Sequence, residues 1–302
     1  MTGSMGRIWQ TALWEWSGAI RSRRALVIIL LYLASALLCM NGSISILGKM
    51  EKELASVLQL PDAGSAGVVS ASLWRSKPFN KIVKAVVGEG PVLDDISGRH
   101  PVELLYAWFA FFCAPLLAVL VCGTRISDDL RSGSVRYLLV RESRIEWSLG
   151  KYLGQTLMVA LALAVSSSGA CVVAFCRLSP STATELFIPL MNWGMRAWIY
   201  SLAWIGLALG LSHFTRSPGK ATVFGILAIC LFAALPPLMR YNHIENGWPE
   251  AVLHLEMFLP SGPESSMWRF DVVPVVTGAF HLILLGLVYL MSGAAFFSRR
   301  DV

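Results

Sequence analysis

Six long, predominantly apolar segments interrupt this sequence, and they constrain its fold more than any other feature. They occupy residues 25–47, 102–122, 152–178, 190–212, 219–239 and 272–297. About 20 apolar residues in a helix cross the ~30 Å hydrocarbon core of a bilayer. Only 15% of the residues are charged, whereas soluble domains carry about a quarter. The sequence therefore predicts an all-α polytopic membrane protein with six transmembrane helices.

The charged residues predict how these helices are oriented. If both termini are cytoplasmic, the cytoplasmic segments are 1–24, 123–151, the short turn after 212 and the C-terminal end, and they contain 14 of the 25 basic residues. An excess of Lys and Arg in short loops marks the cytoplasmic side. We therefore expect one transmembrane domain, 1–302, in the cell (inner) membrane, with outer loops at 48–101 and 240–271. This distribution also explains the pI of about 9.1 without a nucleic-acid partner.

The segment 1–24 has the pattern of an amphipathic helix. Ile8 or Trp9, Leu13, Trp16 and Ile20 recur at spacings of three to four residues, with Arg and Glu between them. Such a helix lies in the membrane interface, where tryptophans also anchor. The alternative is a simple continuation of the first span.

The cytoplasmic loop 123–151 carries an apolar stripe among charges, formed by Leu130, Val135 and Leu138, and a Ser-Gly-Ser step at 132–134 breaks the helix. We expect a short amphipathic helix parallel to the membrane, suited to docking a soluble partner.

Four segments resemble type-2 ABC transporter permeases. The first segment is the loop 123–151. Its matching motifs are the acidic pair 128–129, the step 131–134, the run 138–141, the turn 143–144 and the Leu-Gly-Lys at 149–151. The others are the N-terminal elbow at 14–23, the inner turn at 211–217 and the ending 296–301. The chain departs from the family pattern at Glu142, where proline is usual, and at the acidic pair, where glutamate is usual.

The resemblance implies a permease that pairs with an identical or related permease and binds cytoplasmic ABC ATPase subunits. It also implies an elbow helix, a cytoplasmic coupling helix and an ATPase-coupling surface, which we assign to Asp128, Asp129, Arg131, Ser132, Gly133, Arg136, Arg141 and Arg144. The alternative for these residues is ordinary solvated charge, since surface ion pairs contribute little energy.

No P-loop is present. The Gly-Lys pairs at 48–49, 150–151 and 219–220 lack the glycine five positions earlier and the following Ser or Thr that a phosphate-binding loop needs. We therefore expect no enzymatic activity and no cofactor in this chain, with ATP and magnesium bound by the partner ATPase. The six cysteines lie in or beside apolar runs, which favours buried hydrophobic side chains over a metal site.

Two ionisable residues lie in predicted spans and are candidates for a transport pathway. Arg196 interrupts the fourth span and His281 the sixth, and charges in a bilayer usually face a cavity or a partner. The alternatives are an arginine extending to the interface and a buried, hydrogen-bonded histidine. Gly206 and Gly210 form a Gly-x-x-x-Gly pattern that favours close helix packing.

Two functions remain from the sequence. The first is an exporter permease that couples ATP hydrolysis by a separate subunit to movement of a substrate. The second is an ATP-independent membrane scaffold, or a mechanical transmitter that acts on an extracytoplasmic partner through loop 48–101. We also expect Pro236 and Pro237 to end the fifth span, because proline disrupts the preceding turn.

Overall fold

The computed structural model describes residues 3–57, 74, 83–84, 91–138, 140, 142–246 and 249–299. Within these residues every regular element is a helix. Six helices are long and apolar enough to cross a membrane. The predicted fold class, an all-α polytopic membrane protein, is therefore confirmed.

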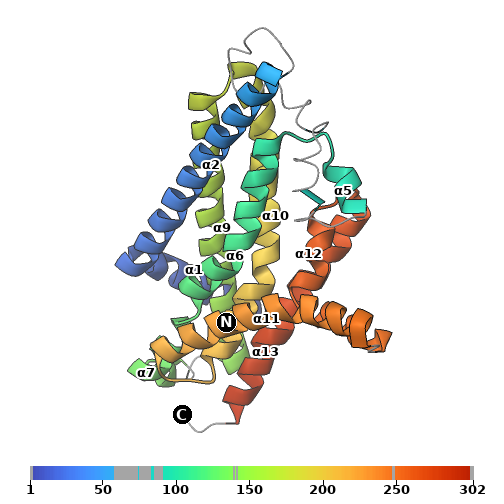
Figure 1. The fold of residues 1–302 in the computed structure, drawn as a ribbon. Helices are drawn as coiled ribbons and strands as arrows, with labels where there is room; N and C mark the ends of the chain where they lie inside the picture. The colour runs from blue at the N-terminus through green and yellow to red at the C-terminus, as the bar shows by residue number, and fades with distance from the viewer. Residues whose placement is uncertain are drawn as a thin grey trace.

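Four long helices run side by side along the molecule in Figure 1. They are α2 (Arg23–Val57), α6 (Pro101–Cys122), α9 (Arg144–Arg177) and α10 (Pro180–Ser212). The central helix is α10, which packs against α6, α9 and α13 (Val272–Ser298). In the apolar stretch of α10, 78% of the residues are buried inside the chain, compared with 22% in the apolar stretches of α2 and α13. The core therefore centres on α10, and the outer helices present their apolar faces outwards.

The helix α1 (Ser4–Arg21) is separated from α2 by Ser22, whose backbone is extended. It leaves the line of α2 and lies across one end of the bundle (Figure 1). The buried residues Ala12 and Ala19 face the core. This helix is distinct from the first span, so the alternative of a simple continuation is wrong.

The helix α11 (Pro218–Asn246) runs across the bundle in Figure 1. Only 11% of the residues in its apolar stretch are buried inside the chain. The candidate span ends at Met239, directly after Pro236 and Pro237, although the helix continues past both prolines to Asn246. Proline is tolerated within membrane helices where the freed carbonyl groups find other partners.

Short helices connect the long ones. They are α5 (Pro91–Ile96), α7 (Arg125–Ser132), α8 (Val135–Leu138), the 3₁₀ helix η1 (Glu250–Phe258) and α12 (Ser261–Met267). Both η1 and α12 fall in the segment 240–271 that was expected to be a loop.

Several helices extend beyond the predicted spans because capping residues, rather than hydropathy, set their ends. The helix α9 begins at Arg144, where Ser143 and Glu146 form a capping box. The helix α10 begins at Pro180, where the Ser179 hydroxyl accepts from Thr182 N–H. These two helices therefore begin before the predicted spans, which start at 152 and 190, and α2 continues past residue 47 to Val57.

Candidate functional site

The short helix α7 is attached to the end of the bundle. It follows α6 after a brief turn, and its residues Ile126 and Ser127 are completely buried. The backbone N–H of Ser127 donates to Ser212 Oγ at the end of α10, at 2.9 Å. At its other end Gly133 adopts a left-handed conformation (φ 73°) that ends α7 and starts the turn to α8. The helix α7 is therefore attached directly to both α6 and α10.

Lys151 is the central residue of this end of the bundle. Its ammonium group lies 2.7 Å from Asp129 on α7 and 2.8 Å from Glu15 on α1. Its side chain is 4% exposed. The second oxygen of Glu15 accepts from Gln155 Nε2 at 2.8 Å. One lysine on α9 thus joins α1 and α7, and we call Glu15, Asp129, Lys151 and Gln155 the Lys151 hub.

Glycines on α9 allow α1 to approach closely. A Cβ atom at Gly150 would lie 2.6 Å from Thr11 Cβ, and one at Gly154 would lie 2.8 Å from the carbonyl oxygen of Ala12. Both distances are shorter than side-chain contacts allow. The glycine of the predicted Gly-Lys pair therefore creates the close packing that brings Glu15 to Lys151.

A second ion pair anchors the start of α1. Arg7 donates to both carboxylate oxygens of Glu146, at 2.6 and 3.3 Å. This hydrogen bond raises the pKa of Arg7 above its ordinary value. Thr11 donates to Glu142 at 2.8 Å. Two turns of α1 are thus bound to the beginning of α9.

The predicted coupling residues have different surroundings in the structure. Asp129 belongs to the Lys151 hub, whereas Asp128 and Arg131 form a weak surface pair at 3.8 Å. The Ser132 hydroxyl donates to the Asp129 carbonyl, and Arg136 is exposed on α8. Arg144 is not in a loop as expected: it starts α9 and donates to the Phe297 carbonyl of α13 at 2.8 Å. Arg141 lies outside the described residues.

Sequence reasoning did not assign roles to Glu15 and Lys151. Both were inside segments that resemble the family, at 14–23 and 149–151. A signal was present, because Glu15 is the single acidic residue in 3–24. An isolated carboxylate in an amphipathic helix indicates a specific partner.

His213 closes the same end of the bundle between α9, α10 and α13. Its Nδ1 lies 2.9 Å from the Leu209 carbonyl and its Nε2 lies 3.1 Å from Ser148 Oγ. Because a carbonyl only accepts, Nδ1 carries the proton and Nε2 accepts from the serine. Burial is complete, and it lowers the pKa of His213 to about 4. The ring is therefore neutral at physiological pH and serves as a hydrogen-bonded core residue.

At the opposite end, Arg196 binds backbone carbonyl groups. Its Nη1 donates to the carbonyl oxygens of Met267 and Arg269, at 2.7 and 2.6 Å. Its guanidinium lies 5.1 Å from the centre of the Trp193 ring and 4.9 Å from that of Phe270. The side chain is buried. Arg196 thus fixes the C-terminal end of α12 to α10 and does not extend outwards.

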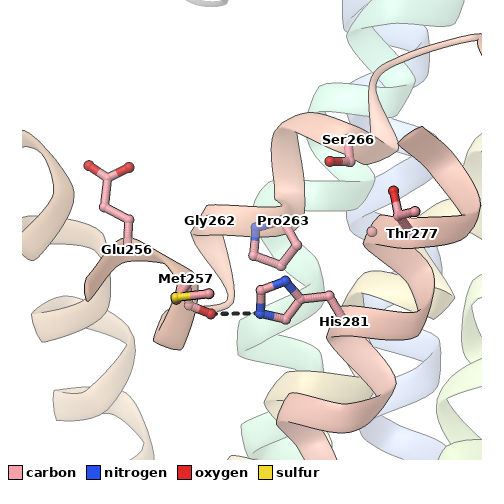
Figure 2. A pocket seen from close by; sticks show the side chains of 8 residues that line it. Glu256, Met257, Gly262, Pro263, Ser266, Thr277 and His281 are labelled. Atoms are coloured by element: carbon pink, nitrogen blue, oxygen red, sulfur yellow. Dashed lines mark hydrogen bonds between the residues drawn. The ribbon is translucent and has the colours of Figure 1, made fainter. Parts of the chain in front are cut away.

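His281 lies beside an open pocket between η1, α12 and α13, with a volume of about 300 Å³ (Figure 2). Its Nε2 donates to the Met257 carbonyl at 2.7 Å. The lining residues are Glu256, Met257, Gly262, Pro263, Ser266, Thr277, Gly278 and His281. His281 and Arg196 have different hydrogen-bond partners, so the structure does not join the two pathway candidates in one site.

Gly206 and Gly210 lie where α10 crosses α13. A Cβ at Gly206 would lie 2.0 Å from the carbonyl oxygen of Gly286, and one at Gly210 would lie 2.5 Å from that of Tyr289. On α13, a Cβ at Gly293 would lie 2.5 Å from the Gly210 carbonyl oxygen. These glycines bring two helices of one chain into backbone contact.

Comparison with known families decides the identity of this bundle. A sequence model described as ABC-2 family transporter protein matches residues 9–302, nearly the whole chain. The chain belongs to the ABC-2 transporter family. It is a membrane transporter subunit, of a family that generally lacks its own ATPase site and associates with an ABC ATPase. A search of curated proteins found no match.

For an ABC-2 permease, the position of the Lys151 hub is informative. The hub connects α7, which lies in the loop that resembles the family's coupling segment, to α1 and α9. The ion pairs of the hub are largely removed from water, where charge interactions are stronger than at the surface. The exposed charges of α7 and α8 lie beside this connection.

Proposed function

We propose that this chain is the permease subunit of an ATP-driven exporter. It forms a dimer with an identical or related permease. The cytoplasmic ABC ATPase subunits that bind to it, rather than this chain, hold ATP and magnesium. Both termini are cytoplasmic, in the cell (inner) membrane. The family supports the transporter role, and the excess of basic residues in the cytoplasmic segments supports the orientation.

The observation that carries this proposal is the bridge from Asp129 through Lys151 to Glu15. A partner that moves α7 must move α9 and α1 with it, because separating a buried charge from its partner costs several kcal/mol. Movement of the ATPase subunits is transmitted by this bridge to the helices of the bundle. The exposed residues Arg131 and Arg136 contact the ATPase.

The exposed apolar faces of the outer helices support the proposal that a second permease and lipid contact this chain. In the apolar stretches of α2, α11 and α13, 22%, 11% and 22% of the residues are buried within the chain. A second permease and membrane lipid cover these faces in the assembled transporter. The substrate leaves through a path formed between the two permeases.

The neighbouring residues Asp129 and Asp128 provide a matched test. The tagged chain is co-expressed with its ATPase, purified in mild detergent and assayed for bound ATPase and for vanadate-sensitive ATP hydrolysis. Asp129→Asn removes a charge from the hub, whereas Asp128→Asn removes the same charge from the surface. We expect the ATPase to co-purify with the wild type and vanadate-sensitive ATP hydrolysis to fall strongly in Asp129→Asn, with Asp128→Asn close to wild type.

Two results would contradict the proposal. The first is the absence of any ATPase in the purified complex. The second is equal vanadate-sensitive ATP hydrolysis by complexes of Asp129→Asn and Asp128→Asn in which both chains insert and remain monodisperse, because the hub would then have no part in coupling.

A further inference from the structure

The helix α1 has an outer face that the bundle does not cover. Ala12 and Ala19 are buried, whereas Trp9, Leu13 and Trp14 are 53%, 42% and 71% exposed. Tryptophan side chains favour the headgroup level of a membrane, where one edge of the ring is hydrated. The outer face of α1 thus has the apolar residues of an interfacial helix.

The same region carries positive charge, which no carboxylate of the described residues balances. Arg21 ends α1 and Arg23 begins α2, and both are exposed. Glu15, the single acidic residue in 3–24, turns inwards and binds Lys151 and Gln155. The charge of the outer face therefore comes from arginines alone, as a consequence of the Lys151 hub.

Trp14 and Arg21 lie on one side of α1. Trp14 and Arg21 are seven residues apart, which at about 100° per residue places them about 20° apart around the axis. Arg24 has a different role, since its Nη1 donates to Thr124 Oγ1 at 3.1 Å. Arg21 and Arg23 are thus the two basic side chains available at this corner.

We propose that the outer face of α1, with Arg21 and Arg23, binds the headgroups of anionic phospholipids in the membrane surface. A basic, tryptophan-bearing amphipathic helix matches this partner in both charge and polarity. An acidic protein surface would satisfy the arginines but not the exposed Trp9, Leu13 and Trp14. The assignment is independent of the ATPase and of the transported substrate.

The test measures lipid retention by the full-length chain in mild detergent. The purified protein is equilibrated with equal amounts of phosphatidylglycerol and phosphatidylcholine, and retained lipid is counted by native mass spectrometry. We expect the wild type to retain phosphatidylglycerol preferentially, and Arg21→Gln/Arg23→Gln to lower that preference on the order of ten-fold.

The double variant Arg131→Gln/Arg136→Gln is the matched control, because it removes two exposed arginines from α7 and α8 at the same end of the bundle. We expect it to retain the wild-type preference. Equal retention of the two lipids by the wild type, or an equal loss in both double variants, would overturn the proposal. A preference that is lost only in the α1 variant supports it.

A variant-free measurement covers the case in which Arg21→Gln/Arg23→Gln does not fold. Electrostatic binding to headgroups weakens as salt shortens the screening length. The wild-type preference for phosphatidylglycerol should therefore fall steeply between about 0.1 and 0.5 M salt. A preference that salt leaves unchanged would contradict binding through the arginines.

Discussion

The ammonium group of Lys151 lies 2.7 Å from the carboxylate of Asp129, and this ion pair joins α7 to the interior of the bundle. The same group lies 2.8 Å from Glu15 on α1. One lysine therefore balances two carboxylates, and the Gln155 amide satisfies a remaining oxygen of Glu15. This cation therefore links α1, α7 and α9.

Removing the cation should destabilise the protein strongly. Lys151→Met leaves Glu15 and Asp129 partly buried with no positive partner, and breaking such a pair costs about 3–5 kcal/mol. We expect a large fall in the apparent melting temperature, measured by size-exclusion chromatography after heating in detergent. The triple variant Glu15→Gln/Asp129→Asn/Lys151→Met removes all three charges and should recover most of the loss. A melting temperature of Lys151→Met equal to wild type would contradict the role of the hub.

A methyl group at Gly206 should separate α10 from α13. The added Cβ would lie 2.0 Å from the carbonyl oxygen of Gly286, and overpacking of this kind costs about 1–3 kcal/mol. We expect Gly206→Ala to lower the melting temperature of the purified chain. Gly42→Ala in α2 is the control, because no atom lies within 4 Å of a Cβ at Gly42. Equal melting temperatures for the two variants would show that the α10–α13 contact is looser than described.

Hydropathy predicts the six spans because lipid requires long apolar helices with every backbone group satisfied. It does not predict where the helices end, because water and headgroups allow a helix to continue. The starts of α9 and α10 depend on Ser143 with Glu146 and on Ser179, which are polar caps outside the apolar runs. Capping patterns therefore supply information that hydropathy lacks.

The Lys151 hub was predicted less completely than the six spans, because it depends on contacts between helices that are distant in the sequence. Asp128 and Asp129 are neighbours in the sequence, but they lie about 100° apart around α7, and only Asp129 faces the bundle. Its partner Lys151 also binds Glu15, 136 residues earlier in the chain. Which of two adjacent carboxylates is buried depends on how distant helices pack, and no local pattern contains that information.

Loss of the Arg196 guanidinium should loosen α12. Arg196 donates to the carbonyl oxygens of Met267 and Arg269, and hydrogen bonds from charged groups contribute about 1.5–3 kcal/mol. Arg196→Lys keeps the charge, but its side chain is one atom shorter than the path to Nη1, the nitrogen that donates to both oxygens. We expect faster hydrogen–deuterium exchange in 261–270 in this variant.

Arg177→Gln is the control for this measurement. Arg177 is exposed at the end of α9 and donates to Ser45 Oγ at 3.0 Å. Its replacement should leave exchange in 261–270 unchanged. Unchanged exchange in Arg196→Lys as well would mean that other contacts hold α12 in place.

His213 should make stability depend on pH between about 4 and 6.5. Burial lowers its pKa from 6.5 to about 4, so in this range the unfolded chain binds a proton that the folded chain does not. Stability therefore rises with pH, and about 2 kcal/mol should be lost between pH 7 and pH 5. We expect His213→Gln to show a smaller fall in melting temperature over this range, and His254→Gln, which changes an exposed side chain, to match the wild type. An equal fall in all three proteins would show that other groups cause the acid sensitivity.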